Sequence, residues 1–177
     1  PRSTLFPYTT LFRSKVDRET MREIVDIARW APSWVNYQIA RYTLVDDEEI
    51  IKEIAEHGVN GFVYNIDTLR TAKGVAVLSF VKGKSGTYDK EYITSKGNSW
   101  EVFDAGIACQ TFCLAAHAKG VGTCIMGVID DKSIAKIVNL PEDETVAALI
   151  VYGYEDGEHA APNKRKDVDE IMRFVDR

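Results

Sequence analysis

The stretch Ser99–Gly127 carries apolar side chains around most of its circumference when it is arranged as a helix. It contains no proline, its only interior glycine is Gly106, and Gly120 is a typical residue for ending a helix. The pattern therefore predicts a helix of about 20 residues, which starts at Ser99 as N-cap. A helix that is apolar on nearly every side is buried, so we expect it in the core or in an interface between subunits.

Three shorter segments have apolar residues at the i, i+3, i+4 spacing of amphipathic helices. The first runs from Asp17 to about Trp30 and ends before Pro32, because the residue that precedes a proline avoids the helical conformation. The other two follow aspartates that can act as N-caps, namely Asp46 or Asp47 and Asp130 or Asp131.

Runs of β-branched and apolar residues predict four strands. Two of them, residues 74–81 and 145–152, are apolar almost throughout, as is typical of strands buried on both faces. The other two are residues 40–45 and 123–128.

Three segments give weaker patterns. Residues 60–71 are mixed and predict no particular element, residues 82–98 are polar and contain glycine, and residues 168–175 fit either a helix or a strand. We expect the 82–98 segment to be a mobile connection. Helices and strands mixed around one buried central helix predict an α+β fold with three layers.

Composition places the chain among ordinary soluble proteins. Of its 177 residues, 45% are hydrophobic and 28% are charged, which fits one domain with a sizeable core. The net charge of −5 argues against nucleic acid or an anionic membrane as the main partner. Three cysteines do not make a disulfide framework, and no apolar run is long enough to span a membrane, so we expect a cytoplasmic protein.

The N-terminal residues have an unusual pattern. Thr4–Ser14 reads TLFPYTTLFRS, which resembles the translation of a DNA-sequencing adapter. We therefore interpret residues 1–14 as a tail without evolved meaning and residues 15–177 as a single domain. A signal peptide fits poorly, since the segment has neither a continuous apolar stretch nor a small-residue cleavage site.

The sequence gives little support for a metal site or for nucleophilic catalysis. Cys109, Cys113 and His117 share one helix face but span about 12 Å along its axis, too far for one tetrahedral zinc. We therefore expect no metal site and interpret the cysteines as small packing residues. The chain also lacks the sequence motifs of serine hydrolases, zinc proteases, P-loops and dinucleotide-binding folds.

Three sets of polar or basic residues remain as candidates for binding. Pro32, Ser33, Asn36 and Gln38 follow the first helix, Thr123–Gly127 follows the central one, and Lys164–Lys166 form a basic triplet. Taken alone, the first set is equally well explained as a capped turn and the triplet as a solvated run of charge.

Taken together, four stretches resemble a known family. ARWAPSWVNYQ, WEVFDAGIACQTFCLAAHAKGVGTCIMGV, LPEDETVAALIVYGY and NKRKDVDEIM, in this order, are similar to the FMN-dependent nitroreductase family from about Lys15 to the end of the chain. The resemblance implies a three-layer α-β-α homodimer, with the long central helix at the interface and two FMN sites between the subunits. It also implies an FMN-dependent NAD(P)H oxidoreductase that passes electrons to a nitroaromatic, a quinone or a similar small-molecule acceptor.

The resemblance also implies roles for individual residues. No side chain is expected to be catalytic, because the flavin carries the chemistry. The family's Arg-Arg-Ser-x-Arg motif, expected about ten residues before Val16, is absent, which leaves the Lys164–Lys166 triplet as the cations for the phosphate. The implied cofactor-binding residues are Pro32, Ser33, Asn36 and Gln38 in one loop, Asn65 beside the flavin ring, the backbone of Ile125, Met126 and Gly127 near its reactive face, and Arg165 with Lys166 at the phosphate.

Two alternatives remain open at this point. The basic triplet followed by Asp-x-Asp-Glu-Ile-Met also fits a flavin-dependent reductive dehalogenase of the same fold. A flavin-binding dimer without turnover is the other alternative. The pattern does not decide between NADH and NADPH as electron donor, nor does it identify the acceptor.

Overall fold

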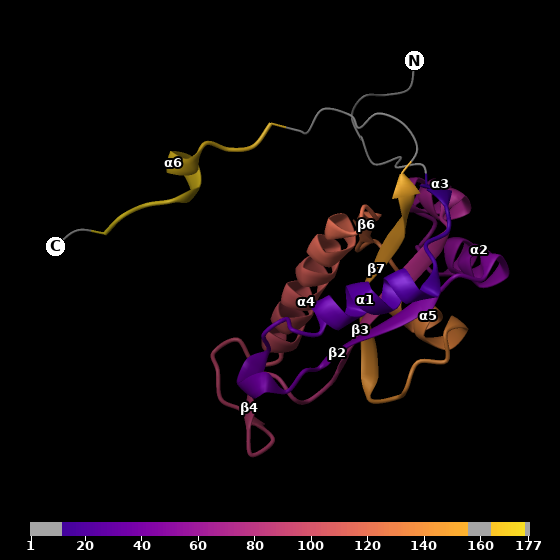
Figure 1. Cartoon of the computed structure of the whole chain (residues 1–177). Coiled ribbons are helices and arrows are strands. Elements are labelled where there is room, and N and C mark those ends of the chain that lie inside the picture. The colour runs from indigo at the N-terminus through magenta and orange to yellow at the C-terminus, as the bar shows by residue number, and fades with distance from the viewer. Residues whose placement is uncertain (1–11, 156–163, 176–177) are drawn as a thin grey trace.

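The computed structural model describes residues 12–155 and 164–175 and combines helices with two antiparallel sheets (Figure 1). The helices are α1 (Arg18–Ala28), α2 (Glu48–His57), α3 (Val63–Thr71), α4 (Ser99–Ala118), α5 (Asp131–Ile137) and α6 (Val168–Ile171), with a 3-10 turn, η1 (Trp34–Asn36). The strands are β1 (Phe12–Ser14), β2 (Ala40–Val45), β3 (Gly74–Val81), β4 (Thr87–Tyr88), β5 (Glu91–Tyr92), β6 (Gly122–Met126) and β7 (Glu144–Glu155).

The larger sheet is organised around β7, which pairs with β3 along one side and with β6 and β1 along the other. Strand β2 then pairs with β3 and completes the order β1-β7-β3-β2, with β6 beside β7. All of these pairs are antiparallel. Strands β4 and β5 form a separate two-stranded sheet.

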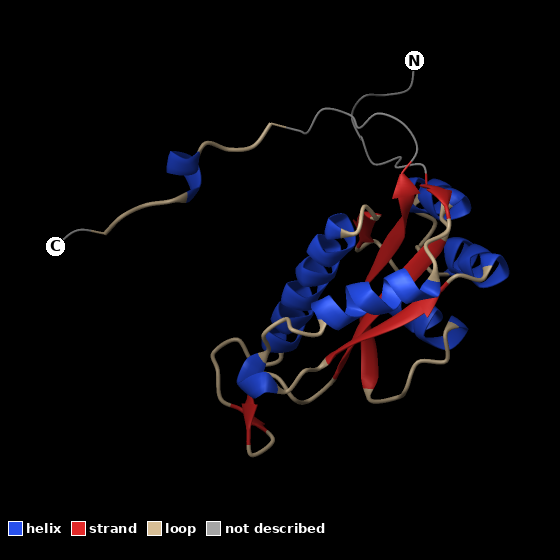
Figure 2. Ribbon diagram, viewed as in Figure 1, coloured by secondary structure: helices blue, strands red, loops and turns tan. Residues whose placement is uncertain are grey.

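Helices cover both faces of the larger sheet (Figure 2). Successive side chains of a strand point to opposite faces, so Val77 and Leu78 of β3 enter two different core clusters. Val77 packs with α2, α3 and α5, whereas Leu78 packs with α1 and with Phe112 of α4. The three-layer α-β-α architecture expected from the sequence is therefore confirmed.

Helix α4 has the predicted length of 20 residues. Its end is set by Gly120, which has a φ of 71° and lies directly after the C-cap Lys119. The predicted start is wrong by one residue, because Asn98 and not Ser99 is the N-cap, and Asn98 makes no side-chain capping bond. Glu101 lies in the first turn, as expected.

The two sides of α4 have different surroundings within the single chain. Ala108, Phe112 and Ala115 face the core and are buried. Phe103 and Leu114 lie on the opposite side and are 57% and 60% exposed. The expected burial is therefore seen on one side only, and an apolar face of the helix is left open.

Two segments with weak sequence patterns have defined structures. Residues 60–71 contain α3, whose N-cap, Phe62, makes no side-chain capping bond. Residues 82–98, which we expected to be mobile, contain the β4-β5 hairpin.

Part of the supposed tail belongs to the sheet. Phe12 is buried in the core, and a Cβ built at Gly153 would lie 2.7 Å from the Cβ of Phe12, so glycine at 153 leaves room for this ring. Residues 1–11 lie outside the described residues. The origin of residues 1–14 stays a prediction, but Phe12–Ser14 contribute to the fold.

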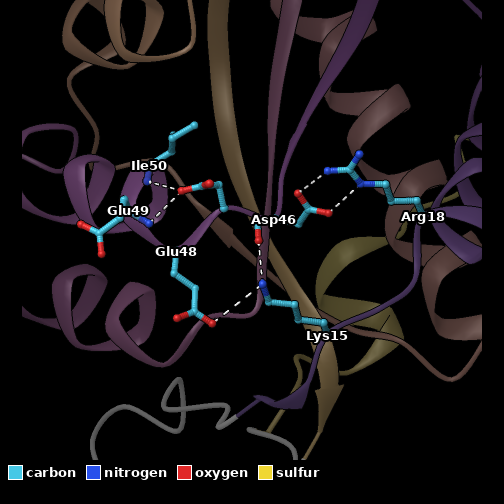
Figure 3. A network of polar contacts seen from close by, with 7 residues as sticks. Lys15, Arg18, Asp46, Glu48, Glu49 and Ile50 are labelled. Atoms are coloured by element: carbon cyan, nitrogen blue, oxygen red, sulfur yellow. Dashed lines mark hydrogen bonds and ion pairs between the residues drawn. The ribbon is translucent and has the colours of Figure 1, made fainter.

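Polar contacts join the start of α1 to the end of β2 (Figure 3). Arg18 donates two hydrogen bonds to the carboxylate of Asp46, and Lys15 donates to the Asp46 carbonyl oxygen at 2.9 Å. Lys15 also lies 3.8 Å from Glu48 at the start of α2. Asp47 caps α2, since its carboxylate accepts from the backbone N–H groups of the first turn.

Within the described ranges, no helix is long and apolar enough to cross a membrane.

Candidate functional site

Residues 33–38, called here the 33–38 turn, leave α1 in an unusual backbone conformation. Val35, Asn36 and Gln38 have positive φ angles of 47°, 58° and 51°. Asparagine tolerates this region, but a β-branched valine there is an outlier. Such conformations cost about 1–3 kcal/mol each and persist only where their surroundings hold them, often at functional sites.

Hydrogen bonds hold this turn from within and from outside. Inside it, Ser33 Oγ accepts from the Gln38 N–H at 2.8 Å. From outside, the carboxylate of Asp104 accepts from the Trp34 N–H at 2.9 Å, and the Trp34 indole N–H donates to the Thr87 carbonyl at 3.1 Å. The turn is thus fastened to α4 and to the β4-β5 hairpin.

A cavity of about 270 Å³ opens beside the turn. Arg41 stands at this cavity, where its guanidinium donates to the carbonyl oxygens of Gln38 and Ala40 at 2.7 and 2.9 Å. Cavity walls come from α1, β2 and α4 and include Pro32, Ser33, Gln38, Arg41, Tyr42 and Asp104.

A second buried acid, Glu101, holds the segment that precedes α4. One of its oxygens accepts from the Gly83 N–H at 2.5 Å, from the Lys84 N–H at 3.3 Å and from the Tyr92 hydroxyl at 3.1 Å. Residues 83–92, called here the 83–92 loop, are therefore fastened to the first turn of α4. This contact is the physical reason that the expected mobile connection has a defined shape.

Asn65 and the end of β6 form a second group. Asn65, on α3, is buried and donates from its side-chain amide to the Val128 carbonyl at 3.0 Å. Ile125 is 52% exposed, while the side chain of Met126 is buried in the core, so Met126 can offer only backbone groups to a ligand. The structure thus brings Asn65 close to Val128, which directly follows residues 125–127, while the roles of these residues at a flavin stay a prediction.

The predicted site residues nevertheless form three separate groups in one chain. The 33–38 turn lies on the side of α1 and α4, whereas Asn65 belongs to α3 on the other helical layer. Arg165 and Lys166 lie on the segment 164–175, which is exposed throughout and extends away from the body (Figure 1). A single copy does not bring these groups into contact.

The cysteines form a small group at the junction of α4 and β6. Cys109 is buried and Cys113 is half-buried. A hydrogen bond from Cys109, assisted by one from Thr123, lowers the pKa of Cys113 to about 7, while the bond to Cys113 and burial raise the pKa of Cys109. Among the described residues, no cluster of three histidine, cysteine or acidic side chains could hold a metal ion.

The family is now clear from comparison with known proteins. The model of the nitroreductase family matches residues 11–154 of the sequence. This chain belongs to the nitroreductase family. The match spans the larger sheet, α1 to α5, the 33–38 turn and the Asn65 group.

Individual relatives are distant in sequence and close in fold. An oxygen-insensitive NADPH nitroreductase of Helicobacter acinonychis is 23% identical over 163 residues, which cover 76% of each chain. A nitroreductase family protein of Streptococcus pneumoniae TIGR4 superposes with a TM-score of 0.79 at 20% identity and covers 94% of each chain. An FMN-dependent nitroreductase of Clostridium difficile R20291 superposes with a TM-score of 0.72 at 25% identity and covers 92% of this chain and 91% of its own.

Proposed function

We propose that this nitroreductase-family protein is an FMN-dependent oxidoreductase. Electrons would pass from NADH or NADPH to a small acceptor such as a nitroaromatic or a quinone. The observation that carries the proposal is the 33–38 turn, whose strained backbone is held in place and whose polar side chains border a cavity. One solved relative, at 25% identity, is itself described as FMN-dependent.

The side chains present fit the polar groups of FMN. Ser33, Asn36 and Gln38 offer a hydroxyl and two amides, and the backbone at Ile125–Gly127 offers groups that are fixed before a ligand arrives. Arg165 and Lys166 are suited to a phosphate, since a guanidinium fork matches its oxygens. When bound, FMN would supply the electron transfer that these side chains cannot perform themselves.

A second copy of the chain would join the three groups of site residues. Phe103 and Leu114 leave an apolar face on α4, and a face of this kind on a family member is a natural subunit interface. We propose a homodimer that forms through this face of α4. The 33–38 turn of one copy would then meet the Asn65 group of its partner, and FMN would lie between the two.

The 83–92 loop would form the acceptor side of the pocket. Its contacts with Glu101 and Asp104 keep its shape, and the half-exposed Tyr92 offers aromatic surface to a planar acceptor. The protein would thus position its substrates and exclude water from the reacting atoms, as expected where the cofactor carries the chemistry.

The decisive experiment is an absorption spectrum of the purified protein with FMN, before and after NADPH or NADH is added without oxygen. We expect a bound-flavin spectrum that bleaches, and whose colour returns when a quinone or nitroaromatic is added. A spectrum that shows binding without bleaching would indicate a flavin-binding dimer without turnover. Colour that returns only with a halogenated aromatic would indicate the reductive dehalogenase.

Titration of the apo-protein with FMN tests the phosphate cations. Arg165→Ala should weaken FMN binding, because a charge-assisted hydrogen bond to the phosphate is lost. Arg173→Ala, a matched change on the same segment, should leave the affinity unchanged. Equal affinities for the two variants would remove Arg165 from the proposed site.

A further inference from the structure

Two buried acids stand three residues apart on α4. Glu101 is 5% exposed and Asp104 is 3% exposed. Within the described parts of the chain, neither takes part in an ion pair, and both instead accept hydrogen bonds from loops. A buried carboxylate without a cation is costly, so its hydrogen bonds have to compensate for the water it has lost.

The two acids differ in what they hold. Among the described residues, Glu101 accepts side-chain hydrogen bonds from the 83–92 loop alone, through Gly83, Lys84 and Tyr92. Asp104 accepts from both sides with a single oxygen, because its Oδ2 takes the Trp34 N–H at 2.9 Å and the Ser85 hydroxyl at 2.5 Å. One carboxylate oxygen therefore bridges the 33–38 turn and the 83–92 loop.

A second contact joins the same two segments. The Trp34 indole donates to the Thr87 carbonyl, and its ring packs at 5.1 Å against Trp100, two residues after the N-cap of α4. Trp34 is thus fixed at both ends, by Asp104 at its backbone and by Thr87 at its ring. Val35, with its positive φ of 47°, directly follows this fixed residue.

We propose that Asp104 is a positioning residue that couples the 33–38 turn to the 83–92 loop. By holding Trp34 and Ser85 together, Asp104 fixes the 33–38 turn and the 83–92 loop relative to each other. The turn would bind FMN, and the loop would face the acceptor. The inference rests on the proposed function. It goes further, because it makes cofactor affinity and acceptor recognition depend on one buried carboxylate that joins the two segments.

Glu101 provides a matched control for Asp104. Both acids lie on the same helix, are buried to the same degree and can be replaced by their amides, which keep an oxygen acceptor and lose the charge. If Asp104 were only a structural acid of α4, then Asp104→Asn and Glu101→Gln would have similar effects. If Asp104 couples the two segments, only its replacement disturbs the 33–38 turn.

The experiment compares Asp104→Asn, Asp104→Ala and Glu101→Gln with the unmodified protein. The Kd of FMN is measured by fluorescence quenching, and the acceptor KM and kcat are measured at saturating FMN. We expect Asp104→Ala to weaken FMN by about tenfold and to raise the acceptor KM as well, through lost charge-assisted hydrogen bonds. The FMN affinity and acceptor KM of Asp104→Asn should lie between those of the unmodified protein and those of Asp104→Ala. Glu101→Gln should raise the acceptor KM while its FMN affinity stays unchanged.

Hydrogen exchange of the backbone amides separates this inference from the proposed function. Without any flavin, Asp104→Asn should speed exchange in both segments, and Glu101→Gln should speed it only in residues 83–92. Unchanged exchange at residues 34–38 in Asp104→Asn, or equal loss of FMN affinity in Glu101→Gln, would overturn the coupling. An unmodified protein that binds no FMN would refute the proposed function, while the exchange data would still decide the role of Asp104.

Discussion

Arg18 and Asp46 meet in a two-point contact, in which Nε and Nη2 of the arginine each donate to a different carboxylate oxygen at 2.8 Å (Figure 3). The two residues are 28 positions apart, so the contact ties the start of α1 to the end of β2. The hydrogen bond from Arg18 holds the pKa of Asp46 below its ordinary value.

Replacement of Asp46 tests this contact through its dependence on pH. A lowered native pKa means that the contact stabilises the fold above the unfolded-state pKa, and that this stability is lost as the pH falls through the lowered value. Asp46→Asn should therefore lower the thermal midpoint at neutral pH, and the difference from the unmodified protein should disappear in strong acid.

Asp26→Asn serves as the control, because its partner Arg29 lies only three residues away within the same helix region. Its effect on the thermal midpoint should be smaller, since the pair joins no separate elements. If Asp46→Asn lowered the thermal midpoint by the same amount at every pH, charge pairing would not be the cause of the lower midpoint.

The open face of α4 leads to a prediction about assembly. Leu114→Glu places a charge on the exposed apolar face while Ala108, Phe112 and Ala115 stay in the core. If this face joins two copies, a buried unpaired charge should convert the dimer to a monomer and lower FMN affinity with it. Light scattering and FMN titration measure the two effects.

Ile50→Glu is the matched control for this change. Ile50 is a partly exposed apolar residue on α2, in the other helical layer, so a charge there should leave the oligomeric state unchanged. A monomeric unmodified protein, or a Leu114→Glu variant that stays dimeric, would contradict an interface on this face.

The local sequence pattern was sufficient to predict much of the fold. Strands β2 and β3 begin and end at the predicted residues, because a continuous apolar or alternating run lies between clear turn signals. The end of α4 followed from Gly120, since glycine is the usual residue at positive φ after a helix. These features depend on neighbours in the chain.

The missed features depend on distant residues. Helix α3 has no side-chain cap and no clear apolar stripe, so only its packing against α2 defines it. The shape of the 83–92 loop depends on Glu101 and Asp104 of the following helix. Contacts of this kind leave no periodic pattern in the sequence.

Only part of the candidate site was predicted, because many of its contacts also join residues that are far apart in the sequence. The polar residues Ser33 and Gln38 were expected there, and they do border the cavity. Trp34, Arg41 and Asp104 were missed, because their role lies in contacts with backbone groups. One signal was available for Asp104, since an acid within an otherwise apolar helix needs buried partners.

The cysteine group leads to a spectroscopic prediction. Since hydrogen bonding to Cys109 and Thr123 lowers the pKa of Cys113, its thiolate should form at a lower pH than that of an ordinary thiol, seen by ultraviolet absorbance. Cys109→Ala should raise that pH and should also lower the free energy of unfolding by about 1 kcal/mol through lost packing. Turnover at saturating FMN should not change, and bound zinc or iron in the untreated protein would contradict the packing role.

The last prediction concerns Val35, whose φ of 47° and ψ of 26° place a β-branched residue in the left-handed region. Glycine adopts this conformation without strain, at an entropy cost of about 0.5–1 kcal/mol in the unfolded chain. The strain relieved is about 1–3 kcal/mol, so Val35→Gly should raise the free energy of unfolding by about 1 kcal/mol. Urea denaturation measures this change.

Val35→Ala separates the backbone from the side chain, because alanine removes the β-branch and keeps most of the restriction on φ. It should be less stable than Val35→Gly. The Val35 side chain is 70% exposed, so little packing within the chain is lost in either variant. If Val35→Gly were instead less stable than the unmodified protein, the side chain would have to pack on something outside this single chain, and a second copy would be the first candidate. Measuring the free energy of unfolding of Val35→Gly and of the unmodified protein at two protein concentrations would test for such a second copy. Only a contact between copies makes the stability depend on concentration.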